Sequence, residues 1–557
     1  MRILDSRRLT GPTMYGPEPA AIAEVAFDPG ESWAQCEPAW RAALTDMLAA
    51  LGWSDARRFS RRFADDSGAA LGFEAPPDAL YAATEVNEWA IAAASQPGDA
   101  ALALGEHAPR LREAIAAERR PELLAILGQA AARGLPAFFD EDGVTVGLGA
   151  RSQTWPLEAV PRPEAVPWSQ LGTIPVVAVT GTNGKTTSAR WLARMFKAAG
   201  LVAGNTSTDG IALDGALVES GDCTGPGAAR RLLRRPQLQA AVLEAARGGL
   251  LRRGFALRWC DAALLTNVSD DHLGEWGILT IDELALAKAA IASAVRPDGR
   301  VVLGADSPPL ARLRGRFAAP QVWFSQRADH PLLLEVVRAG GEACWIEDGA
   351  IVHGRAHQRT SLVATDDIAL ALGGAARHNL ANALGVAATA LGLPIPHEIV
   401  CDTLRNFGRD VHDNPGRLER YERDGVLVLL DFAHNRDGLR QQREVVASLR
   451  RARGGRLVVS FGMAGDRSDE ALMELAGEIA AMRPDHVIVR EEPEYLRGRE
   501  PGVVPAILRR GFEAHGIAPE AIDQADDERA AVAAALRWAR SGDMVAVFAH
   551  TEREPIL

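Results

Sequence analysis

A lysine and two threonines directly follow a glycine-containing loop in the stretch AVTGTNGKTTSARW, residues 178–191. Gly181 and Gly184 permit a tight turn and let backbone N–H groups approach phosphate oxygens closely. Lys185 can reach the β- and γ-phosphates of a nucleotide, and the hydroxyl of Thr186 can ligate Mg²⁺. The other side chains that we expect around the phosphates are Thr182, Asn183 and Thr187. The stretch therefore predicts a nucleotide site that uses Mg²⁺.

The elements around this loop favour a phosphate site over an incidental glycine-rich turn. The apolar run VVAV ends at Val179, and the helical stretch after the loop ends at Gly200, where a C-cap belongs. The N-terminus of such a helix carries a partial positive charge that attracts phosphate. The usual P-loop pattern has a glycine where Val179 stands, so a general GTPase or kinase is disfavoured.

Further polar residues follow two other apolar runs. Glu244 follows the run AAVL, and Asn267, Asp271 and His272 follow the run AALL. The carboxyl ends of parallel strands form the edge where ligands bind an open α/β sheet. Lys288 lies in the next helical stretch, LALAKAAI. Each residue alone has an ordinary alternative, with Glu244 in a solvated loop and Lys288 exposed on a helix.

The elements that must position these residues form two series of short apolar runs separated by helical stretches. Continuous apolar runs are typical of buried parallel strands, so we predict an α/β fold with two doubly wound domains in tandem. The P-loop central domain is expected at 172–412 and the Rossmann-like C-terminal domain at 413–557. Residues 1–165 predict a smaller α+β domain, which a proline-rich linker separates from the rest.

Composition narrows the class of protein. The length of 557 residues suits about three domains. The net charge of −12 and the lack of a basic block argue against nucleic-acid binding. No apolar run approaches the roughly 18 residues needed to span a bilayer, and the start of the chain does not resemble a signal peptide. The 5 cysteines have no CxxC spacing, so we expect reduced thiols and a cytoplasmic protein.

The motif GTNGKTT, which begins at Gly181, resembles the nucleotide loop of the Mur ligase family. Members of that family use ATP to join a carboxylate to an amine. The resemblance implies that Glu244 and His272 ligate Mg²⁺ together with Thr186. Lys288 corresponds to a lysine that is often carbamylated in the family, where it bridges metal and substrate as an additional carboxylate.

The second half of the chain carries further motifs that resemble the family. AARHNLANALG contains Asn379, which the resemblance assigns to the adenine ring. NPGRLERY contains Arg417, which would reach the phosphates of ATP. LLDFAHNRDG contains Asp431, placed near the ribose and the hinge, and His434, placed near the phosphates. A structural histidine is the alternative for His434 taken alone.

Two residues are expected on the acceptor side of the site. Thr224 lies in DCTGP, where the family places its acceptor motif, and a turn that starts a helix is an equal alternative. We also assign Asn267 to substrate binding.

Within the family, the resemblance is closest to the Mur-like half of the cyanophycin synthetases and spans about residues 172–557. We find no room for the ATP-grasp domain that precedes that half in those enzymes. The resemblance implies that arginine is added to an aspartyl side chain. Glu491, Glu492 and Glu494 would hold the guanidinium through charge-assisted pairs, and a solvated acidic loop is the alternative.

Three functions stay open. The favoured one is an ATP-dependent amide ligase that activates a carboxylate as an acyl phosphate and couples it to an amino acid. Its acceptor would be an aspartyl polymer or a dipeptide. The second is a Mur-family ligase with another acceptor, such as a glutamyl chain or a small metabolite. The third is a weakly catalytic partner of a separate ATP-grasp protein.

Overall fold

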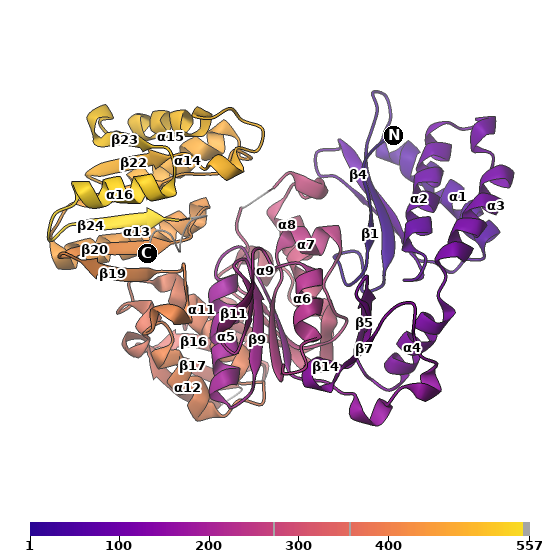
Figure 1. Cartoon of the computed structure of the whole chain (residues 1–557), viewed down its shortest axis with the longest axis horizontal. Helices are drawn as coiled ribbons and strands as arrows, with labels where there is room; N and C mark the ends of the chain where they lie inside the picture. The colour runs from indigo at the N-terminus through magenta and orange to yellow at the C-terminus, as the bar shows by residue number, and fades with distance from the viewer. Residues whose placement is uncertain (271–272, 356–357, 550–557) are drawn as a thin grey trace. The chain divides into compact units, whose positions relative to one another are not determined.

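The computed structural model describes residues 1–270, 273–355 and 358–549. The chain divides into two compact units, whose ribbon is drawn in Figure 1. The first unit comprises residues 1–345, 352–360 and 384–400, and the second comprises residues 346–351, 361–383 and 401–557.

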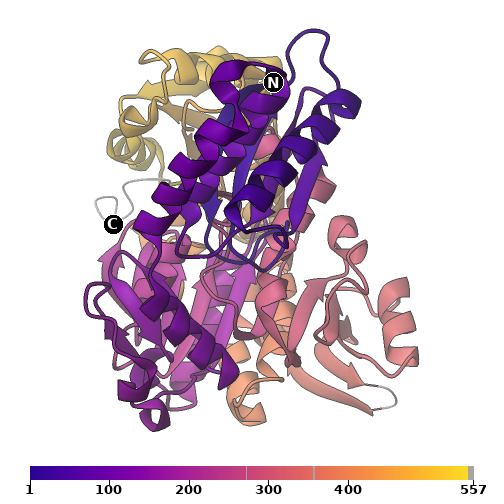
Figure 2. The same cartoon turned by 90° about the vertical axis from the view of Figure 1, so that its right-hand side faces the viewer.

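The N-terminal region combines an antiparallel sheet with three helices. The sheet has the order β1-β2-β4-β3, and the helices lie side by side along it (Figure 2). Alanine and glycine dominate β2 and β4, so the helices can pack closely, and the core is completed by Trp40, Leu44 and Phe73. The elements are β1 (Arg2–Leu9), β2 (Ala20–Ala26), α1 (Trp33–Leu51), β3 (Arg58–Arg62), β4 (Gly68–Glu74), α2 (Leu80–Ser95) and α3 (Leu104–Glu118).

A second, three-stranded sheet completes this region, with the order β5-β6-β7. It packs with one helix around Leu123, Ile126 and Val144. The elements are α4 (Pro121–Ala132), β5 (Ala137–Asp140), β6 (Gly143–Val146) and β7 (Gln153–Trp155).

The central sheet has the order β11-β10-β9-β12-β8-β13-β14-β15-β16-β17-β18. Strand β8 lies between β12 and β13 and is parallel to both, and all of its residues are buried. The strands are β8 (Val176–Thr180), β9 (Ala203–Ser207), β10 (Gly210–Leu213), β11 (Ala216–Ser220), β12 (Ala240–Glu244), β13 (Cys260–Leu265), β14 (Val295–Gly304), β15 (Gln321–Ser325), β16 (Glu342–Glu347), β17 (Ala350–Arg355) and β18 (Gln358–Ala364). The helices are α5 (Lys185–Ala198), α6 (Pro226–Leu233), α7 (Arg247–Arg252), α8 (Ile281–Lys288), α9 (Pro308–Ala311), α10 (Pro331–Arg338), α11 (Arg377–Ala390) and α12 (His397–Asn406).

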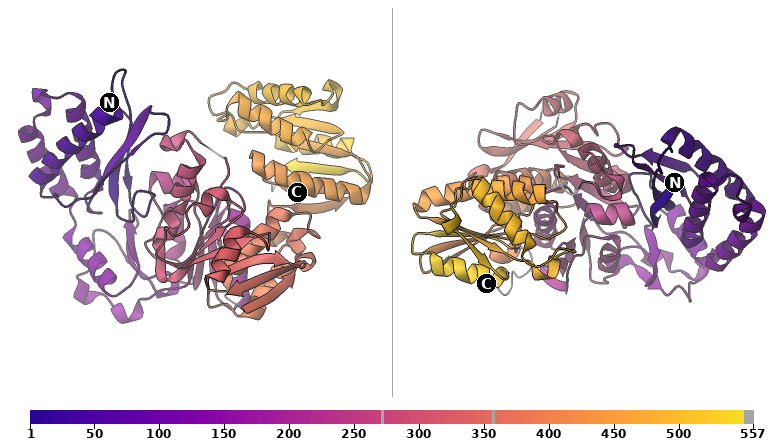
Figure 3. Two further views of the ribbon diagram at one scale, coloured as in Figure 1. Left: turned by 180° about the vertical axis from the view of Figure 1, so that it is seen from behind. Right: turned by 90° about the horizontal axis from the view of Figure 1, so that it is seen from above.

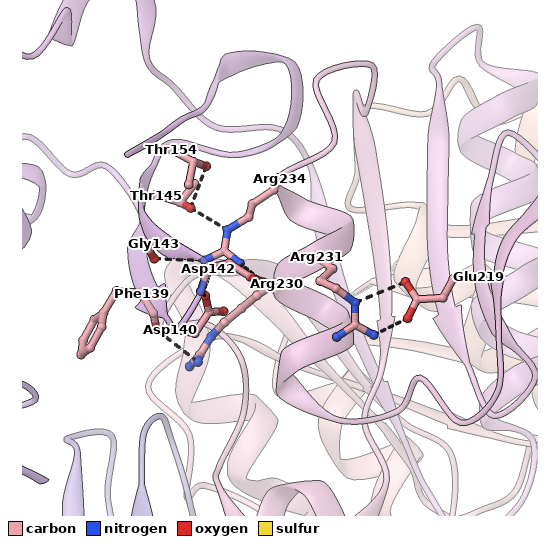
Figure 4. A network of polar contacts seen from close by, with 10 residues as sticks. All are labelled: Phe139, Asp140, Asp142, Gly143, Thr145, Thr154, Glu219, Arg230, Arg231 and Arg234. Carbon is pink, nitrogen blue, oxygen red and sulfur yellow. Dashed lines mark hydrogen bonds and ion pairs between the residues drawn. The ribbon is translucent and has the colours of Figure 1, made fainter. Parts of the chain in front are cut away.

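Arginines at the end of α6 attach the three-stranded sheet to the central part of the first unit (Figure 4). Arg234 donates from Nε to Thr145 Oγ1 at 2.9 Å and pairs with Asp140 at 2.6 Å. Arg230 is buried and donates to the carbonyl of Phe139 at 3.3 Å. The three-stranded sheet is thus bonded to the end of α6 by several separate contacts.

The C-terminal sheet has the order β19-β20-β24-β21-β22-β23 and is parallel from β20 to β23. Successive residues of its strands face two different cores, so helices cover both faces (Figure 3). The elements are β19 (Glu419–Arg423), β20 (Val426–Asp431), α13 (Arg436–Arg453), β21 (Leu457–Phe461), α14 (Asp469–Ala480), β22 (His486–Arg490), α15 (Val503–Ala514), β23 (Ile522–Ala525), α16 (Glu528–Trp538) and β24 (Met544–Phe548).

The predicted α/β fold is confirmed, with parallel strands in both the central and the C-terminal sheet. All five cysteines are buried, and burial raises the pKa of the Cys260 and Cys344 thiols. None of the helices in the described part of the chain combines the length and apolar character needed to cross a membrane.

Candidate active site

The predicted strand, loop and helix are all present, with the loop between the end of β8 and the start of α5. Gly184 has φ 82°, in the left-handed region that favours glycine. Gly181 is required for space, because a Cβ at this position would lie 1.9 Å from the hydroxyl oxygen of Thr266. Neither position accepts a side chain without a change in the loop.

The carboxyl end of β13 supports the loop through Asn267. The backbone carbonyl of Asn267 accepts from the N–H of Thr182 at 2.8 Å, and its side-chain oxygen accepts from the N–H of Asn183 at 3.0 Å. The side-chain amide of Asn267 donates back to the carbonyl of Asn183 at 3.1 Å. Both ends of the amide therefore engage the loop, and the predicted role of Asn267 in substrate binding stays a prediction.

Lys185 is half-buried at the start of α5. Its Nζ donates to the carbonyl of Thr182 at 2.8 Å, so the ammonium group lies across the loop. The positive charge is thus held where the loop and the helix N-terminus also favour an anion.

Glu244 contacts the hydroxyl groups of two threonines. Its Oε2 accepts from Thr186 Oγ1 at 2.8 Å and its Oε1 from Thr208 Oγ1 at 3.3 Å. Glu244 is only 2% exposed, so a buried carboxylate lies directly beside the first turn of α5. Carboxylate and hydroxyl oxygens are the ligands that Mg²⁺ prefers, so this pair fits a metal beside bound phosphates.

The third predicted metal ligand, His272, lies outside the described residues, as does Asp271. Among the residues that are described, no group of three or more His, Cys, Asp or Glu side chains could hold a metal ion. A metal held by Thr186 and Glu244 would therefore need further oxygen ligands, which phosphates and water commonly supply to Mg²⁺.

Lys288 is the last residue of α8 and is 5% exposed. Its Nζ donates to the carbonyl of Gly181 at 2.8 Å. The alternative of a surface lysine is therefore wrong, and the amine lies against the phosphate loop. Carbamylation of Lys288 stays a prediction.

Thr224 lies in the turn that precedes α6. Its hydroxyl donates to Asp222 Oδ1 at 2.7 Å, and its carbonyl accepts from the N–H of Ala246 at 3.3 Å. The local geometry is that of a helix-starting turn, and the same turn lies beside the residues that follow Glu244. Both interpretations of DCTGP therefore remain open.

Two residues that sequence reasoning missed complete this site. Thr208 follows β9 and contacts Glu244, and Thr266 follows β13 and donates to the carbonyl of Asn183 at 2.7 Å. Both come directly after strands of the central sheet, so their position at the carboxyl edge was the signal that could have revealed them.

Four residues predicted to contact the nucleotide lie in the second unit: Asn379, Arg417, Asp431 and His434. Neighbouring residues hold each of their side chains. The Asn379 amide is buried, donates to the carbonyl of Leu370 at 3.1 Å and accepts from Asn382 at 3.1 Å. Arg417 has its guanidinium 4.3 Å from the centre of the Phe432 ring. The roles of these residues toward ATP stay predictions.

Asp431 and His434 shape the end of β20. The carboxylate of Asp431 is buried and accepts from the N–H groups of Leu418 at 2.8 Å and Ala433 at 2.9 Å. Burial raises its pKa, and Arg417 and the two N–H groups oppose that rise. His434 donates from Nδ1 to the carbonyl of Phe432 at 3.0 Å, which fixes the orientation of its ring.

The three predicted specificity glutamates differ from one another. Glu492 is buried and pairs with the chain's own Arg490 at 3.0 Å, and Arg490 is 0% exposed and also pairs with Glu528 at 2.6 Å. Glu491 is buried and accepts from the N–H of Gly502. Glu494 is exposed. Glu494 is thus the exposed member of the predicted set, and the role of all three carboxylates toward a guanidinium stays a prediction.

The sequence was compared with known proteins. Residues 179–390 match the Mur ligase middle domain, and residues 416–551 match the Mur ligase glutamate ligase domain. A UDP-N-acetylmuramoyl-L-alanyl-D-glutamate–2,6-diaminopimelate ligase of Mesorhizobium japonicum is 30% identical over 394 residues, which cover 68% of this chain and 74% of that protein. The chain belongs to the Mur ligase family.

Other Mur ligase relatives match a larger share of this chain at higher identity. The cyanophycin synthetase of Geminocystis herdmanii is 36% identical over 419 residues, which cover 73% of this chain and 47% of that protein. That of Synechocystis is 36% identical over 416 residues, covering 73% and 46%. The chain therefore spans about half the length of these relatives. Among solved structures, E. coli FolC in complex with DHPP and ADP is similar at 19% identity and a TM-score of 0.48, covering 67% of this chain and 85% of that one.

The arrangement around Arg490 predicts that Glu492→Gln lowers the stability of this Mur ligase more than Glu494→Gln. Glu492 is buried against a buried guanidinium, and a hydrogen bond to a charged group is worth about 1.5–3 kcal/mol. Glu494 is exposed, so its replacement should leave the melting temperature unchanged. Thermal unfolding of the two variants beside wild type measures the difference. Equal melting temperatures would contradict a structural role for Glu492.

Proposed function

We propose that this chain is an ATP-dependent ligase that joins a carboxylate to an amine and forms ADP and phosphate. The observation that carries the proposal is the phosphate loop with Lys185 across it and the buried Glu244 carboxylate 2.8 Å from the Thr186 hydroxyl. Membership of the Mur ligase family supports the same reaction class. The proposed location is the cytoplasm.

The proposed reaction has two steps. A substrate carboxylate oxygen attacks the γ-phosphorus of ATP, so that an acyl phosphate forms and ADP leaves. The amine of an amino acid then attacks the acyl carbon, the carbon–oxygen bond to phosphate breaks, and an amide remains. Lys185 neutralises the charge that develops on the transferred phosphoryl group, and Arg417 is proposed as a second cation.

Thr186 and Glu244 would hold Mg²⁺ in this proposal. The metal would supply positive charge to the phosphate oxygens. Lys288 also contacts the loop, with its Nζ at the carbonyl of Gly181. As a carbamate it would present an additional carboxylate to the metal, and as an amine it would orient the loop.

We propose arginine as the incoming amino acid and an aspartyl side chain, in a polymer or a dipeptide, as the acceptor. Two observations support this choice: the 36% identity to cyanophycin synthetases and the exposed carboxylate of Glu494 after a C-terminal strand. A guanidinium pairs bidentately with a carboxylate, which an uncharged side chain cannot do.

Glu494→Gln is expected to raise the KM for arginine by about tenfold, since a charge-assisted hydrogen bond is worth about 1.5–3 kcal/mol and each 1.4 kcal/mol is about tenfold. Neutral amino acids should be used as before. Glu520→Gln, which changes another exposed glutamate of the same domain, is the matched control. An unchanged KM for arginine would place its recognition elsewhere.

The alternatives differ in acceptor and in activity. A glutamyl chain or a small metabolite could replace the aspartyl acceptor, and a protein with little activity could serve a separate ATP-grasp enzyme as a partner. The intact Lys185, Thr186 and Glu244 constellation weighs against the weakly catalytic alternative. A screen of phosphate release with ATP, a panel of amino acids and a panel of acceptors tests the proposal. Release that never depends on an amino acid would refute the ligase.

A further inference from the structure

The turn at residues 274–280 has an unusual backbone. Trp276 has φ 49° and ψ 40°, which places a bulky residue in the left-handed region. Gly274 and Gly277 on either side have φ 100° and φ 60°. Such conformations persist only where surrounding contacts hold them, and they concentrate at functional sites.

The contacts that hold this turn come from Arg61, in β3 of the N-terminal region. Its Nη1 donates to the carbonyl of Gly277 at 2.9 Å and to Glu283 Oε1 at 2.5 Å, and its Nη2 donates to the carbonyl of Trp276 at 3.4 Å. Phe63 packs against the same place, since a Cβ on Gly277 would lie 2.1 Å from its ring. The turn therefore depends on side chains about 215 positions earlier in the sequence.

Arg61 is linked to the phosphate loop by contacts at the two ends of α8. Glu283, the ion-pair partner of Arg61, forms the capping box of this helix with Thr280. The helix ends at Lys288, whose Nζ donates to the carbonyl of Gly181. Because α8 is only eight residues long, we expect a shift of its first turn to displace Lys288 as well.

The turn is also linked to α7, the helix that begins near the proposed metal ligand Glu244. The guanidinium of Arg247 lies 5.3 Å from the centre of the Trp276 ring and pairs with Glu275 at 2.6 Å. Arg247 is the first residue of α7, which begins three positions after Glu244, the last residue of β12. The turn held by Arg61 is thus linked both to α7, which begins near Glu244, and to α8, which ends at Lys288.

We propose that Arg61 is a positioning residue for phosphoryl transfer, so that the N-terminal region is part of the working site. This inference rests on the proposed function. Arg61 acts by fixing the 274–280 turn and α8, and thereby the placement of Lys288 and Arg247. Arginine suits the task because its planar fork can bond two carbonyls and a carboxylate at once, whereas a lysine ammonium cannot reproduce that geometry.

The test compares Arg61→Ala and Arg61→Lys with Arg57→Ala in the full chain. Arg57 is the matched control, since it lies in the same region and pairs with Glu74 at 2.7 Å. Arg61→Ala should lower kcat for amino-acid-dependent phosphate release by about tenfold or more, because small misplacements at a reacting centre are costly. The KM for ATP should change by less than about twofold, because the loop keeps its own hydrogen bonds to Asn267.

Arg61→Lys should recover part of kcat, because it keeps the charge beside Glu283. Hydrogen exchange of the backbone supplies a readout that does not depend on activity. Peptides covering residues 274–288 should exchange faster in Arg61→Ala than in wild type or Arg57→Ala.

Three results would overturn the inference. They are a wild-type kcat in Arg61→Ala, a change confined to the KM for ATP, or an equal loss of activity in Arg57→Ala. If wild type itself shows no amino-acid-dependent phosphate release, the proposed function fails, and exchange at residues 274–288 decides the positioning role alone. Unchanged exchange in Arg61→Ala would then refute it, and faster exchange would support it.

Discussion

Lys185→Ala is expected to abolish amino-acid-dependent phosphate release and to leave the protein folded. The ammonium group lies across the phosphate loop, 2.8 Å from the carbonyl of Thr182, and is half-buried rather than part of a core. Its loss removes a fixed positive charge that opposes the charge developing on the transferred phosphoryl group. Removing one such preorganised group typically costs about 10²–10³ in kcat. We therefore expect a fall of at least this size.

The measurement is phosphate release under saturating substrates, with thermal unfolding of the same samples. Lys197→Ala is the matched control, because Lys197 lies in the last turn of the same helix, where its side chain pairs with Asp214 at 3.3 Å. A Lys185→Ala variant that keeps most of its activity would remove the nucleotide site from this loop. A large fall in melting temperature would instead show that the lysine is structural.

Glu244→Gln should raise the Mg²⁺ concentration needed for half-maximal activity by at least about tenfold, and should lower kcat as well. Glutamine has nearly the same shape, and its side-chain oxygen can still accept from the hydroxyl of Thr186. The change therefore removes the negative charge beside the phosphates while the surrounding hydrogen bonds can persist.

A titration of Mg²⁺ at fixed ATP checks this expectation. Glu219→Gln serves as the control, since Glu219 lies in β11 of the same sheet and pairs with Arg231 at a surface position. If the Mg²⁺ dependence of Glu244→Gln overlays that of wild type, the metal binds elsewhere.

The phosphate loop could be predicted from sequence because its requirements are local. Gly181 and Gly184 are needed for space and for backbone conformation, and an apolar strand and a helix flank them within a few residues. The contact between Thr186 and Glu244 was also within reach. Strand order was not known, but both residues follow apolar runs whose carboxyl ends share one edge of a parallel sheet.

The direction and pairing of other side chains could not be predicted. Glu492 looks like a ligand for a cationic substrate, but it binds Arg490, which is also paired with Glu528, 38 positions away. Asn267 follows a strand at the expected edge, and the bonds of its amide to the loop backbone at Asn183 were not foreseen. Such choices depend on which elements pack together, and the spacing of residues along one chain does not contain that information.

Because all five cysteines are buried, we expect their thiols to react slowly with thiol reagents. Thiolates are the reactive form, and burial disfavours them. A cysteine placed at exposed Tyr81 in the first unit and another at exposed Glu520 in the second would thus be the groups that a maleimide dye labels. The efficiency of energy transfer between two such dyes would report the distance between the two labelled positions. Measured with and without nucleotide, it would show whether that distance changes on binding.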